Sequence, residues 1–365
     1  MKNIKIAYYA PVDFGVGSGV VKKIVAQAEA WEELGAEVKI FAYTASRRLW
    51  SGLPLNLVVP SYKGNLCTRL FVVNHIIDEI LAWKPDVVYM RIGFYYPSFE
   101  RLWKRIPTVV EVNTKERDEA RLHLSYLKYR YHVATVDRFF KKAAGIVCVT
   151  FELAEMLQQF KIPITVISNG IKLSEYKVLP PPSTSDITAV FIGHAWEKSK
   201  YGERRASYKY HGLDKVIQLS GILKNWQFVI IGFSASELPT IPPNVRFFGY
   251  LQRAEYEPIL GNADVGIGSL SLYLKGMNEA CPIKVREYLA FGLPVIAGYR
   301  DTDFLEGAPF LLQLPNTEDN VVKNITVIER FVMHWKGKRV PREAIRHLDI
   351  HYKEAARLAF LRSVL

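Results

Sequence analysis

The chain has 365 residues, which is long for one compact core and suits two domains. Hydrophobic residues make up 49% and charged residues 23%, a globular composition that excludes large-scale disorder. The formal net charge is +12, of which the first 180 residues carry +8; this excess favours an anionic partner, whether phosphate groups, nucleic acid or an anionic membrane face.

Cysteine usage and the apolar runs indicate the compartment. The three cysteines, Cys67, Cys148 and Cys281, lie far apart and form no CxxC, which is typical of a reducing compartment. The opening residues MKNIKIAYYAPVDFG lack the apolar segment of a secretory signal. No run approaches the roughly 18 apolar residues of a membrane span. We therefore expect a cytoplasmic protein.

In the first half of the chain, short apolar runs alternate with amphipathic helical patterns. This alternation predicts a parallel, doubly wound sheet. The predicted strands are 4–11, 37–43, 86–91, 108–112, 145–150 and 164–168, and the predicted helices are 18–35, 69–83 and 117–142.

The alternation stops at 172–186, KLSEYKVLPPPSTSD, which has the proline-rich composition of a linker. It then resumes, with strands predicted at 187–193, 226–232, 244–250, 263–269 and 293–298, and helices near 212–224, 254–261 and 282–291. This pattern predicts two Rossmann-like domains that face each other across a cleft. We expect ligands to bind beyond the carboxyl ends of the strands. The predicted boundaries are 1–175, a linker at 176–186, 187–340, and a C-terminal helix over 341–365, for which packing on the first domain is one option.

A glycine-rich loop joins the first strand to a helix that begins near Ser18. Gly15, Gly17 and Gly19 would let backbone N–H groups approach an anion closely. The GxGxG spacing differs from the dinucleotide GxGxxG, no acidic residue follows the second strand, and no Walker A lysine is present. A tight turn alone explains the loop equally well.

Two further segments of the first half each allow two interpretations, a functional role or an ordinary surface or packing role. Arg91 closes one predicted strand and Asn113 follows the next, so both should lie on the cleft-facing edge, unless they are ordinary surface residues. Residues 121–142 are basic and aromatic, as in a helix that lies on an anionic membrane, although the aromatic residues could instead pack on the domain.

In the second half, Gly193 ends a predicted strand and a basic, aromatic loop follows it. That loop could meet a diphosphate or form solvated surface, and the sequence leaves both readings open. Its cations are Lys198, Lys200, Arg204 and Arg205.

The segment NEACPIKVREYLAFGLPVIAG, residues 278–298, carries the most chemistry. Pro282 suits the first turn of a helix and Gly292 its C-terminal end. Glu279 then precedes the helix while Glu287 lies more than a turn inside it, so the spacing does not imply an acid/base pair. Backbone N–H groups and Lys284 suit phosphate oxygens, and the carboxylates suit sugar hydroxyls. The segment predicts a nucleotide-sugar pocket.

Several motifs together resemble retaining glycosyltransferases of the GT-B fold, family 4 (group 1). They are GVGSGVVKKIVAQAEAWEELGAEV, VVYMRIGFYYP, TVVEVNTKE, TVISNGI, FIGHAW, HGLDKVIQL, VIIG, NVRFFGYL, ADVGIG and the E-x7-E of NEACPIKVREYLAFGLPVIAG. The resemblance extends to about residue 315.

The resemblance implies roles for individual residues. Glu287 would bind the ribose, and Glu279 would be the catalytic contact to the transferred sugar. Lys284 would meet the diphosphate, and Arg91 and Asn113 would lie on the acceptor side. The remaining implied donor-site residues are Gly17, Ser18, Gly193, His194, Met277 and Asn278.

The chain departs from the family pattern at three positions. His194 and His211 stand where the family has Arg and Lys at the diphosphate, and Asn113 stands where it often has His. Lys284 or the basic loop would then take over the phosphate contact. Asp301 and Asp303 could be mistaken for a metal-binding DxD, but they follow a strand in a loop, and a structural role is favoured. We expect no metal and no other cofactor.

The resemblance implies transfer of a sugar from a UDP- or GDP-type donor to a glycan or lipid-linked glycan in cell-surface polysaccharide synthesis. A cytoplasmic enzyme, peripheral on the inner membrane face, would suit this role, with no nucleic-acid partner. Three alternatives stay open: a GT-B sugar-nucleotide epimerase, a dinucleotide-dependent oxidoreductase, and a non-catalytic basic protein that binds nucleic acid or glycan.

Overall fold

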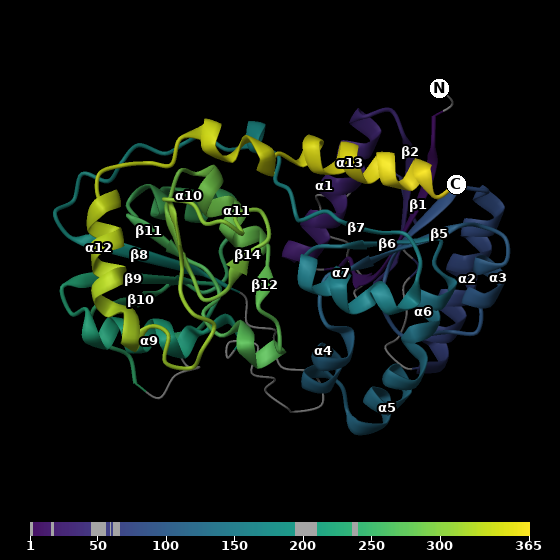
Figure 1. Cartoon of the computed structure of the whole chain (residues 1–365), viewed down its shortest axis with the longest axis horizontal. Helices are drawn as coiled ribbons and strands as arrows, with labels where there is room; N and C mark the ends of the chain where they lie inside the picture. Colours follow the sequence, from purple (N-terminus) through teal and green to yellow (C-terminus); the bar gives the residue numbers. More distant parts are fainter. Residues whose placement is uncertain are drawn as a thin grey trace. The chain divides into compact units, whose positions relative to one another are not determined.

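The computed structural model describes residues 3–15, 18–44, 56–58, 60, 66–193, 210–235 and 240–365. The chain forms two compact α/β units (Figure 1). The first consists of Met1–Gly170 and Ile350–Leu365, and the second of Ile171–Asp349. The chain therefore crosses between them twice, after Gly170 and after Asp349.

The first unit is built on a seven-stranded, wholly parallel sheet with strand order β3-β2-β1-β4-β5-β6-β7. Its central strands are buried along nearly their whole length, as expected for a parallel sheet covered on both faces. The strands are β1 (Lys5–Asp13), β2 (Glu37–Tyr43), β3 (Leu57–Val58), β4 (Val87–Arg91), β5 (Thr108–Val112), β6 (Gly145–Cys148) and β7 (Ile164–Val166).

The helices of the first unit include the C-terminal one, α13 (Ile350–Ser363), which packs on α1 (Gly19–Glu33). The others are α2 (Leu66–Trp83), α3 (Phe99–Trp103), α4 (Glu116–His123), α5 (Tyr126–Thr135), α6 (Asp137–Lys142), α7 (Phe151–Leu157) and the 3-10 turn η1 (Gln158–Phe160). The prediction of one helix over 117–142 is wrong, because Leu124 and Ser125 adopt extended backbone and a second break falls at Val136.

The second unit has a six-stranded parallel sheet of order β10-β9-β8-β11-β13-β15. Its strands are β8 (Ile187–Ile192), β9 (Trp226–Ile231), β10 (Val245–Phe247), β11 (Val265–Ile267), β13 (Val295–Ala297) and β15 (Leu311–Gln313). A separate parallel pair joins β12 (Glu279–Ala280) to β14 (Arg300–Asp301). The predicted doubly wound parallel architecture is thus confirmed for both units.

Three described helices of the second unit lie between these strands in sequence, and α12 follows the last strand. They are α9 (Leu213–Ile222), α10 (Arg253–Gly261), α11 (Ile283–Ala290) and α12 (Ile325–Trp335), with 3-10 turns η2 (Leu173–Glu175), η4 (Leu272–Lys275), η5 (Val322–Asn324) and η6 (Arg342–Leu348). Among the described helices, none is long and apolar enough to cross a bilayer.

The segment predicted as a linker, 176–186, belongs to the second unit in the structure. The Leu179 amide donates to the Phe291 carbonyl at 3.0 Å, and the Arg339 guanidinium binds the carbonyls of Leu179 and Pro180. The predicted C-terminal helix, 341–365, is likewise divided: η6 lies in the second unit and α13 in the first.

Candidate functional site

The second unit's candidate site is centred on the start of α11. Pro282, with extended backbone (φ −70°, ψ 141°), caps the helix rather than occupying its first turn. At the other end Gly292 has φ +86°, the left-handed conformation that favours glycine after a helix. Pro282 and Gly292, both recognised in the sequence, therefore mark the two ends of the helix. The N–H groups of its first turn have no partner within the helix.

Lys284 lies in the first turn of α11, and its ammonium is buried. In the part of the chain that the structure describes, Nζ has no hydrogen-bond partner. It lies 4.2 Å from the centre of the Phe191 ring, on β8. Burial lowers the pKa of Lys284 to about 7. An ammonium buried without a paired charge is energetically costly, and burial therefore favours the neutral amine.

Glu279 lies on β12 and is 8% exposed. It precedes α11, as predicted, but in a two-residue strand rather than a loop, because it pairs with Arg300 in the short parallel ladder to β14. That ladder is itself fixed, because the fully buried guanidinium of Arg286 binds both carboxylate oxygens of Asp301, at 2.6 and 2.8 Å, and also the carboxylate of Asp303.

The contacts of Arg286 give Asp301 and Asp303 a structural role. Their carboxylates are neutralised by a buried cation and hold the strand that pairs with Glu279. Among the described residues, no group of three or more His, Cys, Asp or Glu side chains is placed to hold a metal ion.

Met277 and Asn278 lie in the turn before β12, and Asn316 holds that turn. The Asn316 amide donates to the Met277 carbonyl at 2.7 Å and to Asn278 Oδ1 at 3.1 Å. Its own Oδ1 accepts from the Tyr273 backbone at 2.8 Å. Asn316 was not predicted from the sequence, because it is 38 residues from Asn278 and follows a strand too short to show periodicity.

Glu287 accepts hydrogen bonds from two tyrosines on one carboxylate oxygen. Tyr176 OH lies 3.3 Å and Tyr256 OH 3.1 Å from Oε1. Burial raises the pKa of both hydroxyls, and the charge of Glu287 raises it further, so both remain protonated and donate. The Arg253 guanidinium covers the Tyr176 ring at 3.7 Å. No local pattern linked these tyrosines to Glu287 in the sequence.

Gly193 and His211 lie at the carboxyl end of the same sheet. A side chain at Gly193 would come within 2.1 Å of the Phe233 ring, so the glycine allows close packing there. His211 Nδ1 lies 3.4 Å from Ser269 Oγ. His194, Gly17 and the basic loop with Lys198, Lys200, Arg204 and Arg205 lie outside the described residues.

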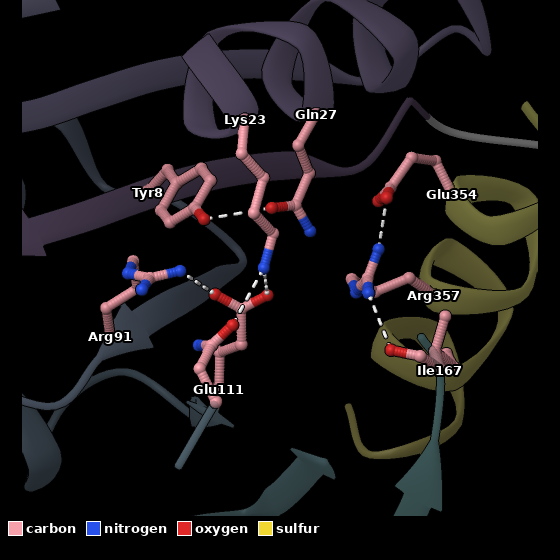
Figure 2. A network of polar contacts seen from close by, with 9 residues as sticks. Tyr8, Lys23, Gln27, Arg91, Glu111, Ile167, Glu354 and Arg357 are labelled. Carbon is pink, nitrogen blue, oxygen red and sulfur yellow. Dashed lines mark hydrogen bonds and ion pairs between the residues drawn. The ribbon is translucent and has the colours of Figure 1, made fainter. Parts of the chain in front are cut away.

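In the first unit Ser18 caps α1, since its hydroxyl accepts from the Val21 amide at 3.3 Å. Arg91 and Asn113 both belong to one polar network, seen in part in Figure 2. Its centre is Glu111, which the sequence analysis overlooked, although an acid inside the otherwise apolar strand TVVEV is a signal for a buried ion pair.

Residues 17–175 match the family model described as Glycosyltransferase Family 4. No curated protein matches the sequence significantly. Among solved structures, sucrose-phosphate synthase from Thermosynechococcus elongatus shares 12% identity over 99% of both chains, with a TM-score of 0.71.

Two other solved structures resemble the chain over nearly its full length. A lipopolysaccharide outer core galactosyltransferase, WaaB, has 13% identity over 98% of this chain and 100% of its own, with a TM-score of 0.62. An α-glucosyltransferase in complex with UDP and a 13-mer DNA containing a HMU base has 10% identity over 99% and 100%, with a TM-score of 0.63. At such identities the likeness establishes the fold alone.

Proposed function

We propose that this chain, which has the GT-B fold and matches the family-4 glycosyltransferase model over residues 17–175, is a retaining enzyme that uses a UDP- or GDP-type sugar donor. The acceptor is a glycan or lipid-linked glycan in cell-surface polysaccharide synthesis. Two observations support this reading: the UDP complex of one structural neighbour and the lipopolysaccharide role in the name of another.

The buried ammonium of Lys284 carries the proposal. It lies in the first turn of α11, where helix N–H groups also favour negative charge. The donor's diphosphate supplies the counter-charge that Lys284 lacks among the described residues. Glu287 then binds the ribose, and Glu279, Met277 and the neighbouring Asn278 bind the transferred sugar.

The proposed reaction is a front-side displacement. The bond between the sugar's anomeric carbon and the diphosphate oxygen breaks, and a bond to the acceptor oxygen forms on the same face. The acceptor's proton passes to the leaving diphosphate oxygen, so no protein base is required. Lys284 and the α11 N-terminus stabilise the charge that develops on the diphosphate. No metal is needed for this step, and Arg286 already neutralises the Asp301 and Asp303 carboxylates.

We place the enzyme in the cytoplasm, peripheral on an anionic membrane face. The α4–α5 turn exposes Leu122, Tyr126 and Leu127, at 41%, 71% and 79%. The exposed cations Arg121, Lys128 and Arg130 lie in the same stretch. Apolar side chains flanked by cations suit the headgroup region of an anionic bilayer.

The membrane surface is tested with vesicles of phosphatidylcholine alone or mixed with phosphatidylglycerol. Binding should require phosphatidylglycerol, fall with added salt, and weaken when Lys128 and Arg130 are changed to Glu. The matched control is the double variant Lys104→Glu with Arg105→Glu, at another exposed surface of the same unit. Equal binding by wild type and the variant changed at Lys128 and Arg130 would refute the surface.

The donor site is tested by thermal shift with a panel of nucleotides and nucleotide sugars, on the wild type and on Glu287→Ala. Stabilisation by UDP or GDP compounds, lost in the variant, supports the proposal. Stabilisation by NAD(P) alone, or salt-dependent RNA binding without any nucleotide response, contradicts it. Release of a free sugar or an epimer without an acceptor would instead identify an epimerase.

A further inference from the structure

Asn113 follows β5, and its side chain is held in one orientation by Lys23. Lys23 Nζ lies 2.9 Å from Asn113 Oδ1. An ammonium group can only donate hydrogen bonds, so the contact itself assigns the oxygen of the carboxamide to Lys23. The NH2 group of Asn113 is then the part turned away from Lys23. Among the described residues, none accepts a hydrogen bond from it.

Lys23 is itself fixed by a buried carboxylate. Its ammonium lies 2.8 Å from Glu111 Oε1, and Arg91 Nη1 lies 2.7 Å from Oε2 of the same residue. The Glu111 side chain is 0% exposed and that of Lys23 11%. Figure 2 shows these three side chains converging from α1, β4 and β5. The order of contacts is Arg91, Glu111, Lys23, Asn113.

The carboxylate at the centre of this chain of contacts is ionised. Burial by itself would raise the pKa of Glu111, but the ammonium of Lys23 and the guanidinium of Arg91 outweigh it and hold that pKa well below its usual range. Arg357, on α13, adds a further positive charge. Glu111 therefore anchors Lys23 at any pH near neutrality.

We propose that Lys23 is a positioning residue that locks the Asn113 carboxamide with its NH2 group toward the acceptor side of the reaction. Asn113 then serves only as a hydrogen-bond donor, and the group that it meets is an oxygen of a bound sugar. Arg91, which the sequence placed among acceptor contacts, acts through Glu111 and Lys23 instead. This inference rests on the proposed function.

The charge on Lys23 is what enforces the orientation. Burial lowers its pKa to about 8, while Glu111 opposes that shift and Arg91 and Arg357 add to it. Once deprotonated, the amine gains a lone pair that can accept from the Asn113 NH2 group, so either amide orientation becomes possible. The lock therefore weakens as the pH rises through about 8.

A double-mutant cycle tests the positioning role. The variants are Lys23→Met, Asn113→Ala and the double variant, with kcat and the acceptor KM measured at saturating donor. Asn113→Ala should lower kcat/KM by about tenfold, the worth of one hydrogen bond, and Lys23→Met by several-fold. The double variant should be no slower than Asn113→Ala alone. Additive losses would overturn the inference.

The Asn113→Asp variant keeps the contact to Lys23 but removes the N–H donor. The carboxylate keeps the contact to Lys23 as an ion pair, so the melting temperature should hold, but it presents no N–H and kcat/KM should fall as far as in Asn113→Ala. Undiminished activity of this variant would contradict the inference. Lys22→Met, at an exposed neighbour on α1, is the control and should change neither value.

A readout without catalysis keeps this inference separate from the proposed function. In 15N-labelled protein the Asn113 NH2 group should give one sharp pair of resonances, which Lys23→Met or a pH well above 8 should broaden or double. Unchanged resonances in Lys23→Met overturn the lock even if the enzyme is active. Failure of every nucleotide sugar to react or bind overturns the proposed function instead.

Discussion

The Lys284 ammonium lies against the face of the Phe191 ring, 4.2 Å from its centre, in a site where burial lowers the lysine pKa to about 7. The aromatic face compensates part of the lost hydration of the ammonium, but a ring supplies less stabilisation than a carboxylate. Deprotonation of Lys284 and binding of an anion would each relieve the energetic cost of the buried ammonium. Both effects can be measured.

Replacing Lys284 with Met should stabilise the ligand-free protein while abolishing donor binding. Methionine fills a similar volume without the unpartnered charge, so we expect a gain of about 1–3 kcal/mol at neutral pH. Differential scanning calorimetry with and without UDP measures both effects. Lys224→Met, at an exposed lysine of the same unit, should change neither the melting temperature nor the UDP response. A destabilised Lys284→Met protein that still binds UDP would contradict this reading.

Donor binding should take up a proton. The diphosphate favours the charged form of Lys284, so its pKa rises from about 7 on binding, and affinity should fall as the pH is raised above that value. Isothermal titration in buffers of different ionisation enthalpy, on either side of pH 7, measures the uptake. Proton uptake that persists in a Lys284→Met variant would assign it to another group.

The same lysine also gives stability a pH dependence. Because its pKa is lower in the folded than in the unfolded protein, the charged form destabilises the fold. The free energy of unfolding of the ligand-free protein should therefore rise as the pH increases from about 7 toward the unfolded lysine value near 10.5. Lys284→Met should remove this rise, and Lys224→Met should retain it.

Local patterns in the sequence were sufficient for much of the fold and for part of the site. Strand–helix alternation predicted both parallel sheets, and Pro282 and Gly292 marked the limits of α11. The strands β12 and β14 were missed because two residues show no periodicity. The helix break after His123 was missed because neither Leu124 nor Ser125 is a glycine or a proline.

The partners of the site residues were the part that could not be predicted. Glu279, Lys284 and Glu287 lie within one segment, so their spacing is visible in the sequence. Tyr176 is 111 residues from Glu287, and Lys23 is 90 from Asn113, and only the folded sheets bring these pairs together. Nothing in GVVKKIV distinguishes the exposed Lys22 from the largely buried Lys23.

Because Arg286 neutralises the Asp301 and Asp303 carboxylates, replacing these carboxylates should destabilise the protein, whereas removing metal ions should not lower its activity. Replacing both Asp301 and Asp303 with Asn leaves the buried guanidinium of Arg286 without a carboxylate, which should cost about 3–5 kcal/mol. The melting temperature measures this cost, and Asp319→Asn, at an exposed ion pair with Lys323, should leave it unchanged. Treatment of the wild type with EDTA should not reduce turnover. Loss of activity in EDTA, restored by a divalent ion, would refute the metal-independent mechanism.

The two tyrosines on Glu287 predict a loss of nucleotide affinity in a variant that folds normally. Tyr256→Phe removes one of the hydroxyls that orient the carboxylate, 3.1 Å from Oε1, while keeping the ring in the core. We expect about fivefold weaker UDP binding, the worth of roughly 1 kcal/mol of hydrogen bonding, with kcat little changed. Tyr352→Phe, at an exposed tyrosine on α13, is the matched control. Unaltered UDP affinity in Tyr256→Phe would show that the carboxylate needs no such support or lies away from the nucleotide.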